Sequence, residues 1–273
     1  MKPLLLTFDL EEFDLGVEWG RPLAIADQID VTARGLTRLV PLLEAHRVCA
    51  TFFTTAVFAQ ARGDLLRGLA DAGHEVAVHG LAHQDDYGQM DAVTAVKRLE
   101  QARAIVELAA GGRAAGIRTP HLRPCPADRL RAAGFDYDAS PHPTWVPTRY
   151  NGLRLPRRPW RDSGLLRVPI SVLPGCRVPV SFVWYRAVGK RLRPLALAAA
   201  SRGAPYLHLY FHPWEAEDIR RYGAPAWLAV GTGAAFVTAL EALLNWAAPR
   251  LRAETVGSFS VAYNRDRGSP AAA

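Results

Sequence analysis

The chain has 273 residues, of which 49% are hydrophobic, and this is enough for one large α/β domain with a sizeable core. Its three cysteines, Cys49, Cys125 and Cys176, are far apart and odd in number, which argues against a disulfide framework or a thiolate zinc site. The formal net charge is +7, yet no recognition helix or stacking motif accompanies it, so we expect no nucleic-acid partner.

No signal peptide is expected, because the apolar run at 4–6 is short and acidic residues follow it at once. The longest apolar stretch, 226–247, contains glycine, glutamate and asparagine, and we interpret it as a buried helix and not as a membrane span. We therefore expect a cytoplasmic protein, with the inner membrane face as one place where it could act.

Short apolar runs alternate with helical patterns along the chain. The predicted elements are, in chain order, a strand at 3–9, a helix at 32–46, a strand at 48–54, the end of a helix at 65–72, a strand at 75–79, a helix at 93–109, a strand at 116–119, a helix at 127–133, strands at 135–138, 165–170 and 206–211, and a helix at 232–247. This alternation predicts a parallel sheet with helical crossovers.

Two segments have no clear period. The segment 140–169 is rich in proline, arginine and tryptophan, and we predict a long loop over the functional site. No linker or internal repeat divides the rest, so residues 1–263 are predicted to form a single domain and 264–273 a disordered tail.

Carboxylates crowd the end of the first strand. Asp9 and Glu11 are two residues apart and point to the same face of an extended chain, while Leu10 points to the other. One carboxylate can bind a metal ion while the other accepts a proton. Glu12 and Asp14 are open to two interpretations, as solvated loop acids or as members of the site, with Glu12 as ligand in place of Glu11.

Histidines and an arginine follow later strands. His79 and His83 are four residues apart, a spacing that brings two imidazoles to one side of a helical turn, and two histidines with one carboxylate leave a position open for water. Arg118 can clamp a carboxylate. His212 ends the seventh strand and is the candidate general acid, whereas His208 lies deeper and is interpreted as structural.

These residues occur in four ordered motifs that resemble those of the polysaccharide deacetylases, the NodB-homology or carbohydrate esterase 4 group. The motifs are Thr7-Phe8-Asp9-Leu10-Glu11, His79-x-x-x-His83, Arg118-Thr119-Pro120 and Leu209-Tyr210-Phe211-His212. The resemblance runs from about residue 4 to 215, and the His-Pro-Trp-Glu sequence at 212–215 is similar to one branch of the group. It implies a distorted, incomplete (β/α) barrel with about seven parallel strands.

The resemblance also implies roles. Asp9 matches the catalytic base, Arg118 the residue that orients it, and His212 the general acid. The implied metal ligands are Glu11, His79 and His83, and the implied substrate-binding residues are Tyr210, Pro120, Asp138 and Trp214, with a backbone N–H near Asp138 as an oxyanion donor.

The chain departs from the usual pattern in three places. Leu10 occupies the position of a second aspartate, and Glu11 serves in its stead. His121 follows the third motif where glycine is usual. The tryptophan of the fourth motif is open between Trp145 and Trp160.

The expected function is metal-dependent removal of an N-acetyl or N-formyl group from an amino sugar in a polysaccharide, glycolipid or glycoside. The expected ion is Zn²⁺, with Co²⁺, Ni²⁺ and Fe²⁺ as alternatives. The substrate could be linked to a lipid phosphate, in which case the arginines and tryptophan of 149–167 would contact phosphate and membrane. Alternatives are an allantoinase-like hydrolase of small amides, a glycosidase using Glu11 and Glu215, and an inactive glycan-binding module.

Overall fold

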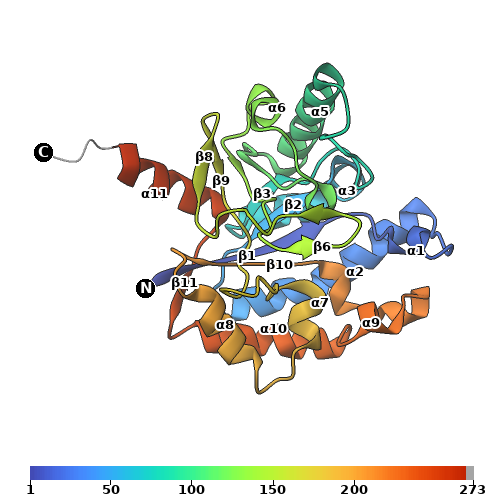
Figure 1. The fold of residues 1–273 in the computed structure, drawn as a ribbon. Coiled ribbons are helices and arrows are strands. Elements are labelled where there is room, and N and C mark those ends of the chain that lie inside the picture. The colour runs from blue at the N-terminus through green and yellow to red at the C-terminus, as the bar shows by residue number, and fades with distance from the viewer. Residues whose placement is uncertain (269–273) are drawn as a thin grey trace, which may run out of the picture.

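The computed structural model describes residues 1–268, in which one curled, open sheet carries helices on its outer side. Figure 1 shows α5 and α6 on one side of the strands and α8 and α10 on the other. The sheet order is β10-β1-β2-β3-β4-β5-β9-β8, and β11 also pairs with β1. The strands are β1 (Lys2–Leu10), β2 (Thr51–Thr54), β3 (Glu75–Val78), β4 (Gly116–Ile117), β5 (Tyr137–Asp138), β8 (Trp160–Asp162), β9 (Leu165–Arg167), β10 (Leu207–Phe211) and β11 (Leu251–Ala253).

Neighbouring strands from β10 to β9 are parallel, and β8 is antiparallel to β9. The predicted incomplete (β/α) barrel is therefore confirmed. The helices are α1 (Leu15–Glu18), α2 (Ile25–Ala45), α3 (Ala56–Ala61), α4 (Gly63–Asp71), α5 (Ala92–Ala110), α6 (Ala127–Ala132), α7 (Phe182–Ala187), α8 (Arg193–Ser201), α9 (Ala226–Ala229), α10 (Ala234–Ala247), α11 (Val256–Gly268) and the 3₁₀ helices η1 (Pro120–Leu122), η2 (Pro213–Ala216) and η3 (Ile219–Tyr222). Within residues 1–268, no helix is long and apolar enough to cross a membrane.

Alternation along β1 separates a packing face from a chemical face. Leu6, Phe8 and Leu10 belong to the large core formed with the outer helices, and the ring of Phe8 stacks on Phe52 with centroids 5.2 Å apart. Asp9 falls on the opposite face, inside the curl of the sheet. The central strand thereby delivers a carboxylate to the interior rim while its other face contributes to the core.

The segment 140–169 is not the long loop that the sequence predicted. It contains the hairpin β6 (Trp145–Val146) with β7 (Tyr150–Asn151), as well as β8 and β9. Ser163 and Gly164 join β8 to β9 with φ values of 48° and 82°, the two positive angles that a tight hairpin turn needs. Strands of two or three residues are too short to show a period of two, which explains the error.

Two helix boundaries also differ from the prediction. Helix α2 begins at Ile25 and not near residue 32, because its first turns bury polar Gln28 and expose Ile25, which hides the apolar period. Helix α11 extends to Gly268, so 264–268 is helical and corrects that part of the predicted disordered tail; residues 269–273 lie outside the described residues. Phe259 and Val256 of α11 pack into the interior of the sheet.

One close backbone approach fixes the strand end that carries the fourth motif. Gly35 of α2 lies against η2 so closely that an added Cβ would be 2.0 Å from the carbonyl oxygen of Pro213. Only glycine permits this contact between α2 and the residue that follows His212.

We expect Gly35→Ala to lower the free energy of unfolding by about 1–3 kcal/mol, because the methyl group has no space. The matched control is Gly68→Ala in α4, where no atom lies within 4 Å of the added Cβ, and which should stabilise the fold by about 0.5–1 kcal/mol. Urea denaturation measures both. A Gly35→Ala protein as stable as the wild type would contradict the close approach.

Candidate metal-dependent active site

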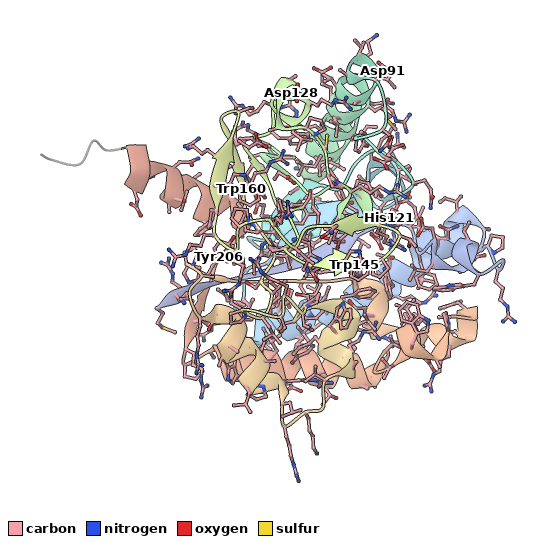
Figure 2. All side chains as sticks on the ribbon, viewed as in Figure 1. Asp91, His121, Asp128, Trp145, Trp160 and Tyr206 are labelled. Carbon is pink, nitrogen blue, oxygen red and sulfur yellow. The ribbon has the colours of Figure 1, made fainter. Side chains whose placement is uncertain are left out.

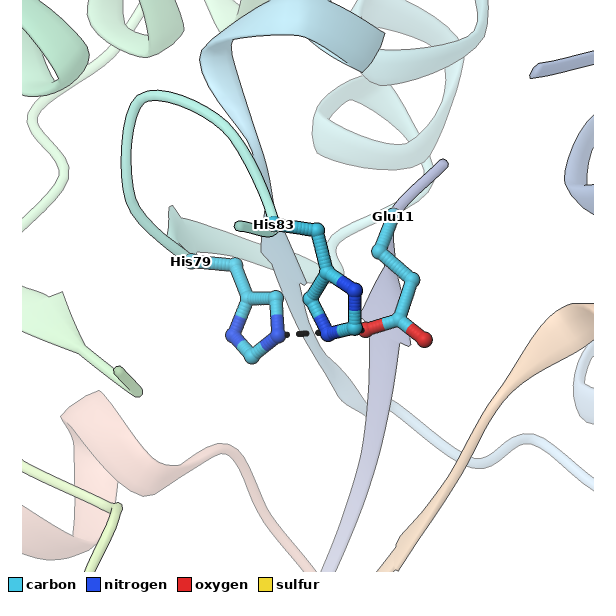
Figure 3. Close-up of side chains that lie close together, drawn as sticks. All are labelled: Glu11, His79 and His83. Atoms are coloured by element: carbon cyan, nitrogen blue, oxygen red, sulfur yellow. Dashed lines mark hydrogen bonds and ion pairs between the residues drawn. The ribbon is translucent and has the colours of Figure 1, made fainter. Parts of the chain in front are cut away.

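Three ligand atoms converge at the rim of the sheet, as Figure 3 shows. Glu11 Oε2 lies 3.2 Å from His79 Nε2 and 2.8 Å from His83 Nε2, and all three residues are buried. Tetrahedral ligands at about 2.0–2.1 Å from Zn²⁺ lie ~3.3 Å from one another, close to these separations. A second candidate group, Asp14, His83 and His121, shares one imidazole with the first.

The hydrogen bonds on the far side of each imidazole favour a cation between them. His79 Nδ1 lies 2.8 Å from the carbonyl oxygen of Arg118, and since a carbonyl only accepts, Nδ1 carries the proton and Nε2 presents a lone pair. His83 Nδ1 lies 3.0 Å from Asp14 Oδ2. Such carboxylate and carbonyl partners are typical of metal-bound histidines, and the donor set fits a divalent ion.

The charges of the three groups depend on one another. Burial would raise the pKa of Glu11, but His83 above all, and then His212 and His79, hold it well below its usual value. Burial opposes charge on His83, yet Glu11 and Asp14 raise its pKa well above the usual value. The negative charge of Glu11 and the positive charge of His83 therefore stabilise each other.

The turn that carries the two histidines is not helical, contrary to the prediction. His79 directly follows β3, and the chain then turns through Gly80, whose φ of 101° is reserved for glycine. An added Cβ on Gly80 would lie 2.9 Å from Tyr87 Oη and from a ring carbon of Pro120. This tight turn, rather than helical periodicity, brings His83 back over His79.

Asp9 is held by a fully buried arginine. Arg118 Nη1 donates to Asp9 Oδ1 at 2.6 Å, and Nη2 donates to His208 Nε2 at 2.8 Å. His208 Nδ1 in turn lies 3.2 Å from the carbonyl oxygen of Pro169, and burial followed by the charge of Arg118 lowers its pKa well below the usual value. Neutral His208 thus fixes the guanidinium that fixes Asp9, consistent with its interpretation as structural.

His212 faces Asp9 of β1 and Glu11, which directly follows β1. Its Nε2 lies 3.9 Å from Asp9 Oδ2 and 3.7 Å from Glu11 Oε1, while Nδ1 lies 3.3 Å from Glu215 Oε1. Burial lowers the pKa of His212, but Glu11, Glu215 and Asp9 together raise it above its usual value. Glu215 pairs at 2.5 Å with the buried Arg186.

Trp214 contacts both Glu11 and His212. Its indole Nε1 donates to Glu11 Oε1 at 3.2 Å, and its ring stacks on His212 with centroids 4.6 Å apart. Trp214 thus orients a ligand and the imidazole, besides lining the cavity where it was predicted to bind substrate.

A cavity of about 450 Å³ opens over these groups, within the range of small-molecule sites (~300–1,000 Å³). Asp9, Glu11, His79, His83, Tyr210, His212 and Trp214 line it. Two predicted substrate residues do not. Pro120 packs against Gly80 instead, and Asp138 lines a separate cavity of about 220 Å³.

Asp138 is committed to neighbours that the sequence did not indicate. It lies in register with Arg167 on β9 and forms an ion pair with it, and it also accepts a hydrogen bond from Ser140 N at 2.8 Å. Its partner could not be foreseen because β5 is only two residues long.

The neighbouring acids take distinct positions. Glu12 accepts a hydrogen bond from Thr55 Oγ1 at 2.6 Å and is not part of the group formed by Glu11, His79 and His83. Asp14 is buried and contacts His83, so it is not a solvated loop acid. His74 accepts from Ala50 N at 3.1 Å, away from the cavity, in agreement with a structural role.

Sequence reasoning missed His121 as part of the cavity wall. Its ring lies 4.0 Å from that of His83, and its Nδ1 lies 2.7 Å from Arg149 Nη1. Burial first, and then the charge of His83, lower its pKa to about 2. Its φ of 54° is uncommon for a residue other than glycine, and the unusual histidine after Pro120 was the available signal.

The two candidate tryptophans separate. Trp145 lines the cavity of the metal ligands, whereas Trp160 lines the smaller cavity with Asp138. In Figure 2, Trp145 and His121 lie in the same region of the view, and Trp160 lies elsewhere.

We expect Arg118→Met to destabilise the protein by about 3–5 kcal/mol, because it leaves the Asp9 carboxylate buried without its partner. The double variant with Asp9→Asn should recover part of this loss. The matched control is Arg113→Met, whose ion pair with Asp136 is exposed and should contribute less than about 1 kcal/mol. Denaturant titration of the wild type, the two single variants and the double variant measures the free energies of unfolding. Equal losses in the Arg118 and Arg113 variants would contradict the contribution of the buried pair.

Comparison with known proteins connects this geometry to a family. Residues 2–137 match the family model described as Polysaccharide deacetylase. A Chitooligosaccharide deacetylase of Sinorhizobium fredii (strain NBRC 101917 / NGR234) is 43% identical over 47 residues, which span 17% of this chain and only 22% of that relative.

Solved structures share the fold. The Puue Allantoinase has a TM-score of 0.66 at 18% identity and covers 98% of this chain and 92% of its own. A probable polysaccharide deacetylase from Pseudomonas aeruginosa PAO1 has a TM-score of 0.67 at 17% identity, with coverage of 98% and 92%. The family match assigns residues 2–137, about half of the chain, to the polysaccharide deacetylase family, the carbohydrate esterase 4 or NodB-homology group.

Proposed function

We propose that the protein is a metal-dependent hydrolase that removes an N-acetyl or N-formyl group from an amino sugar. The observation that carries this proposal is the convergence of Glu11, His79 and His83 on one point beside Asp9 and His212. The proposed branch is the one with Glu11 as carboxylate ligand and the His-Pro-Trp-Glu sequence at 212–215.

Glu11 Oε2 and the Nε2 atoms of His79 and His83 would hold the ion, for which we propose Zn²⁺ with Co²⁺, Ni²⁺ or Fe²⁺ as alternatives. When bound, such an ion lowers the pKa of water and polarises an acyl oxygen. The carbonyl oxygen of Arg118 and the carboxylate of Asp14 orient the two imidazoles for this task.

Asp9 acts as the general base in this proposal. Its Oδ1 is engaged by Arg118, which stabilises the negative charge and leaves Oδ2 directed toward His212 and the cavity. Oδ2 can therefore accept the proton of the attacking water.

His212 acts as the general acid. Its Nδ1 is held by Glu215, and its Nε2 faces the cavity within 4 Å of both first-strand carboxylates. Nε2 can therefore donate a proton to the departing amine, while Tyr210 lines the adjoining wall where we place the acyl group.

The rival functions differ in what the site offers. A glycosidase with Glu11 and Glu215 as its pair is disfavoured, because Glu215 is fully buried against Arg186 and does not line the cavity. Hydrolysis of a small non-sugar amide remains the second candidate, on the fold shared with Puue Allantoinase. We propose a cytoplasmic location, including the inner membrane face.

The decisive assay is amine release from N-acetylated oligosaccharides, with allantoin as the rival substrate and a chelated sample as reference. Release of amine that stops on chelation and returns with added Zn²⁺ supports the proposal. Hydrolysis of allantoin alone would favour the second candidate, and activity unaffected by complete metal removal would exclude the proposed chemistry.

We expect His79→Ala to lose bound metal and amine release together, because it removes one of three ligands. Elemental analysis of purified protein and the amine assay measure the two losses. The control is His46→Ala, at the C-cap of α2 and outside the cavity, which should keep both. Full metal content in the His79 variant would contradict its role as a ligand.

His212→Ala should retain metal but slow turnover by about 10²–10⁴, because it removes a proton donor and no ligand. The measurement is kcat at saturating substrate with the metal content determined on the same sample. Unchanged turnover would show that another group protonates the amine.

A further inference from the structure

Two unlike groups of side chains line the cavity. One is polar and contains Asp9, Glu11, the histidines, Tyr150 and Tyr210, and the other comes from three short helices. The second group is here called the apolar wall and comprises Leu15 and Trp19 at α1, Val183 and Trp184 of α7, and Trp227 and Leu228 of α9. Apart from indole N–H groups, these six side chains offer no hydrogen-bonding atom.

Large rings at the cavity mouth are open to solvent. Trp227 is 64% exposed and Trp184 is 45% exposed, and Trp145 of β6, which also lines the cavity, is 59% exposed. Single exposed apolar residues are ordinary, but several exposed tryptophans that line one cavity indicate a binding surface.

The apolar wall is fixed to the proposed general acid. Arg186 of α7 binds Glu215, which holds His212, and the same guanidinium donates to the carbonyl oxygens of Leu228, at 2.8 Å, and Val230. Behind the wall, Leu15 and Leu228 pack with Trp214 in one buried cluster. Arg186 thus joins α7 and α9 to the reacting groups, and the cluster with Trp214 joins α1 to them.

Three arginines of 149–167 are committed to protein partners, whereas Arg149 lines the cavity beside His121. Arg157 donates to the carbonyl oxygens of Ala200 and Arg202, and Arg158 to that of Gly203. Arg167 is committed to Asp138 and Asp162.

We propose that the substrate is an amphiphile: its acylated amino sugar occupies the polar side of the cavity, and a hydrocarbon aglycone lies on the apolar wall. This inference rests on the proposed function for the sugar half. A glycan chain fits less well, since sugar rings need hydrogen-bond partners next to aromatic faces, and the tryptophans of the wall are accompanied by Leu15, Val183 and Leu228, which offer none. A hydrocarbon chain needs only apolar surface removed from water.

The test uses binding, not turnover. Isothermal calorimetry compares methyl β-glucoside with octyl β-glucoside, kept below its micellar concentration, on the intact metal-loaded protein. Each methylene that leaves water completely strengthens binding about fourfold. We expect octyl glucoside to bind at least about tenfold more tightly than methyl glucoside, since part of the chain stays in solvent.

The variants Trp227→Ser and Trp184→Ser should each reduce this preference at least about threefold without changing metal content. The control is Leu108→Ser on α5, an 82% exposed apolar residue outside the cavity, which should keep it. Equal affinity for the two glucosides would overturn the inference. So would tighter binding of chitotetraose than of octyl glucoside, lost in the tryptophan variants, since the rings would then stack on sugars.

Because the glucosides carry no acyl group, the result separates two failures. An octyl preference without any amine release would support the apolar wall and reject the proposed function. Amine release from N-acetylated sugars without an octyl preference would do the reverse.

Discussion

The contact on which the site depends is that of two imidazole nitrogens with one carboxylate oxygen of Glu11. A lone pair facing a carboxylate at 3.2 Å is repulsive unless a positive charge lies between them. At His83 a proton on Nε2 can supply this positive charge. At His79 the proton of the neutral ring lies on Nδ1, which donates to the carbonyl oxygen of Arg118, so Nε2 carries none. Two imidazolium ions on one oxygen would crowd charge in a buried space, whereas one divalent cation satisfies all three atoms together.

Arg118 links this centre to the proposed base through both of its polar ends. The backbone carbonyl orients His79, and the guanidinium binds Asp9 and His208. Because the residue is fully buried, neither contact can be replaced by water. Arg118 therefore sets the relative position of His79 and Asp9, which are 70 residues apart in the chain. Arg118 directly follows β4, a central strand that is bonded to β3 on one side and to β5 on the other.

Much of this arrangement could be predicted from sequence because parallel strands end at one rim. The alternation in β1 separated Asp9 and Glu11 from Leu10, and the residues just after β3, β4 and β10 followed from the apolar runs. The predictions that failed concern short or irregular segments of the chain. Two-residue strands hid the pairing of Asp138, the buried acid Asp14 looked like a loop residue, and the turn at Gly80 replaced the expected helix. The periodicity of apolar residues gives no information on segments of only two or three residues or on single turns.

The apolar wall was invisible for a further reason. α1 and α9 have four residues each and α7 has six, so none shows a period, and their tryptophans are far apart in the chain. Arg186 links α7, α9 and η2, and two of its partners are backbone carbonyls, which any sequence provides. Catalytic groups are constrained by residue type and therefore leave motifs. A surface that selects hydrocarbon needs only size and apolarity, so that many sequences satisfy it, and it becomes evident only when three distant segments are seen to border one cavity.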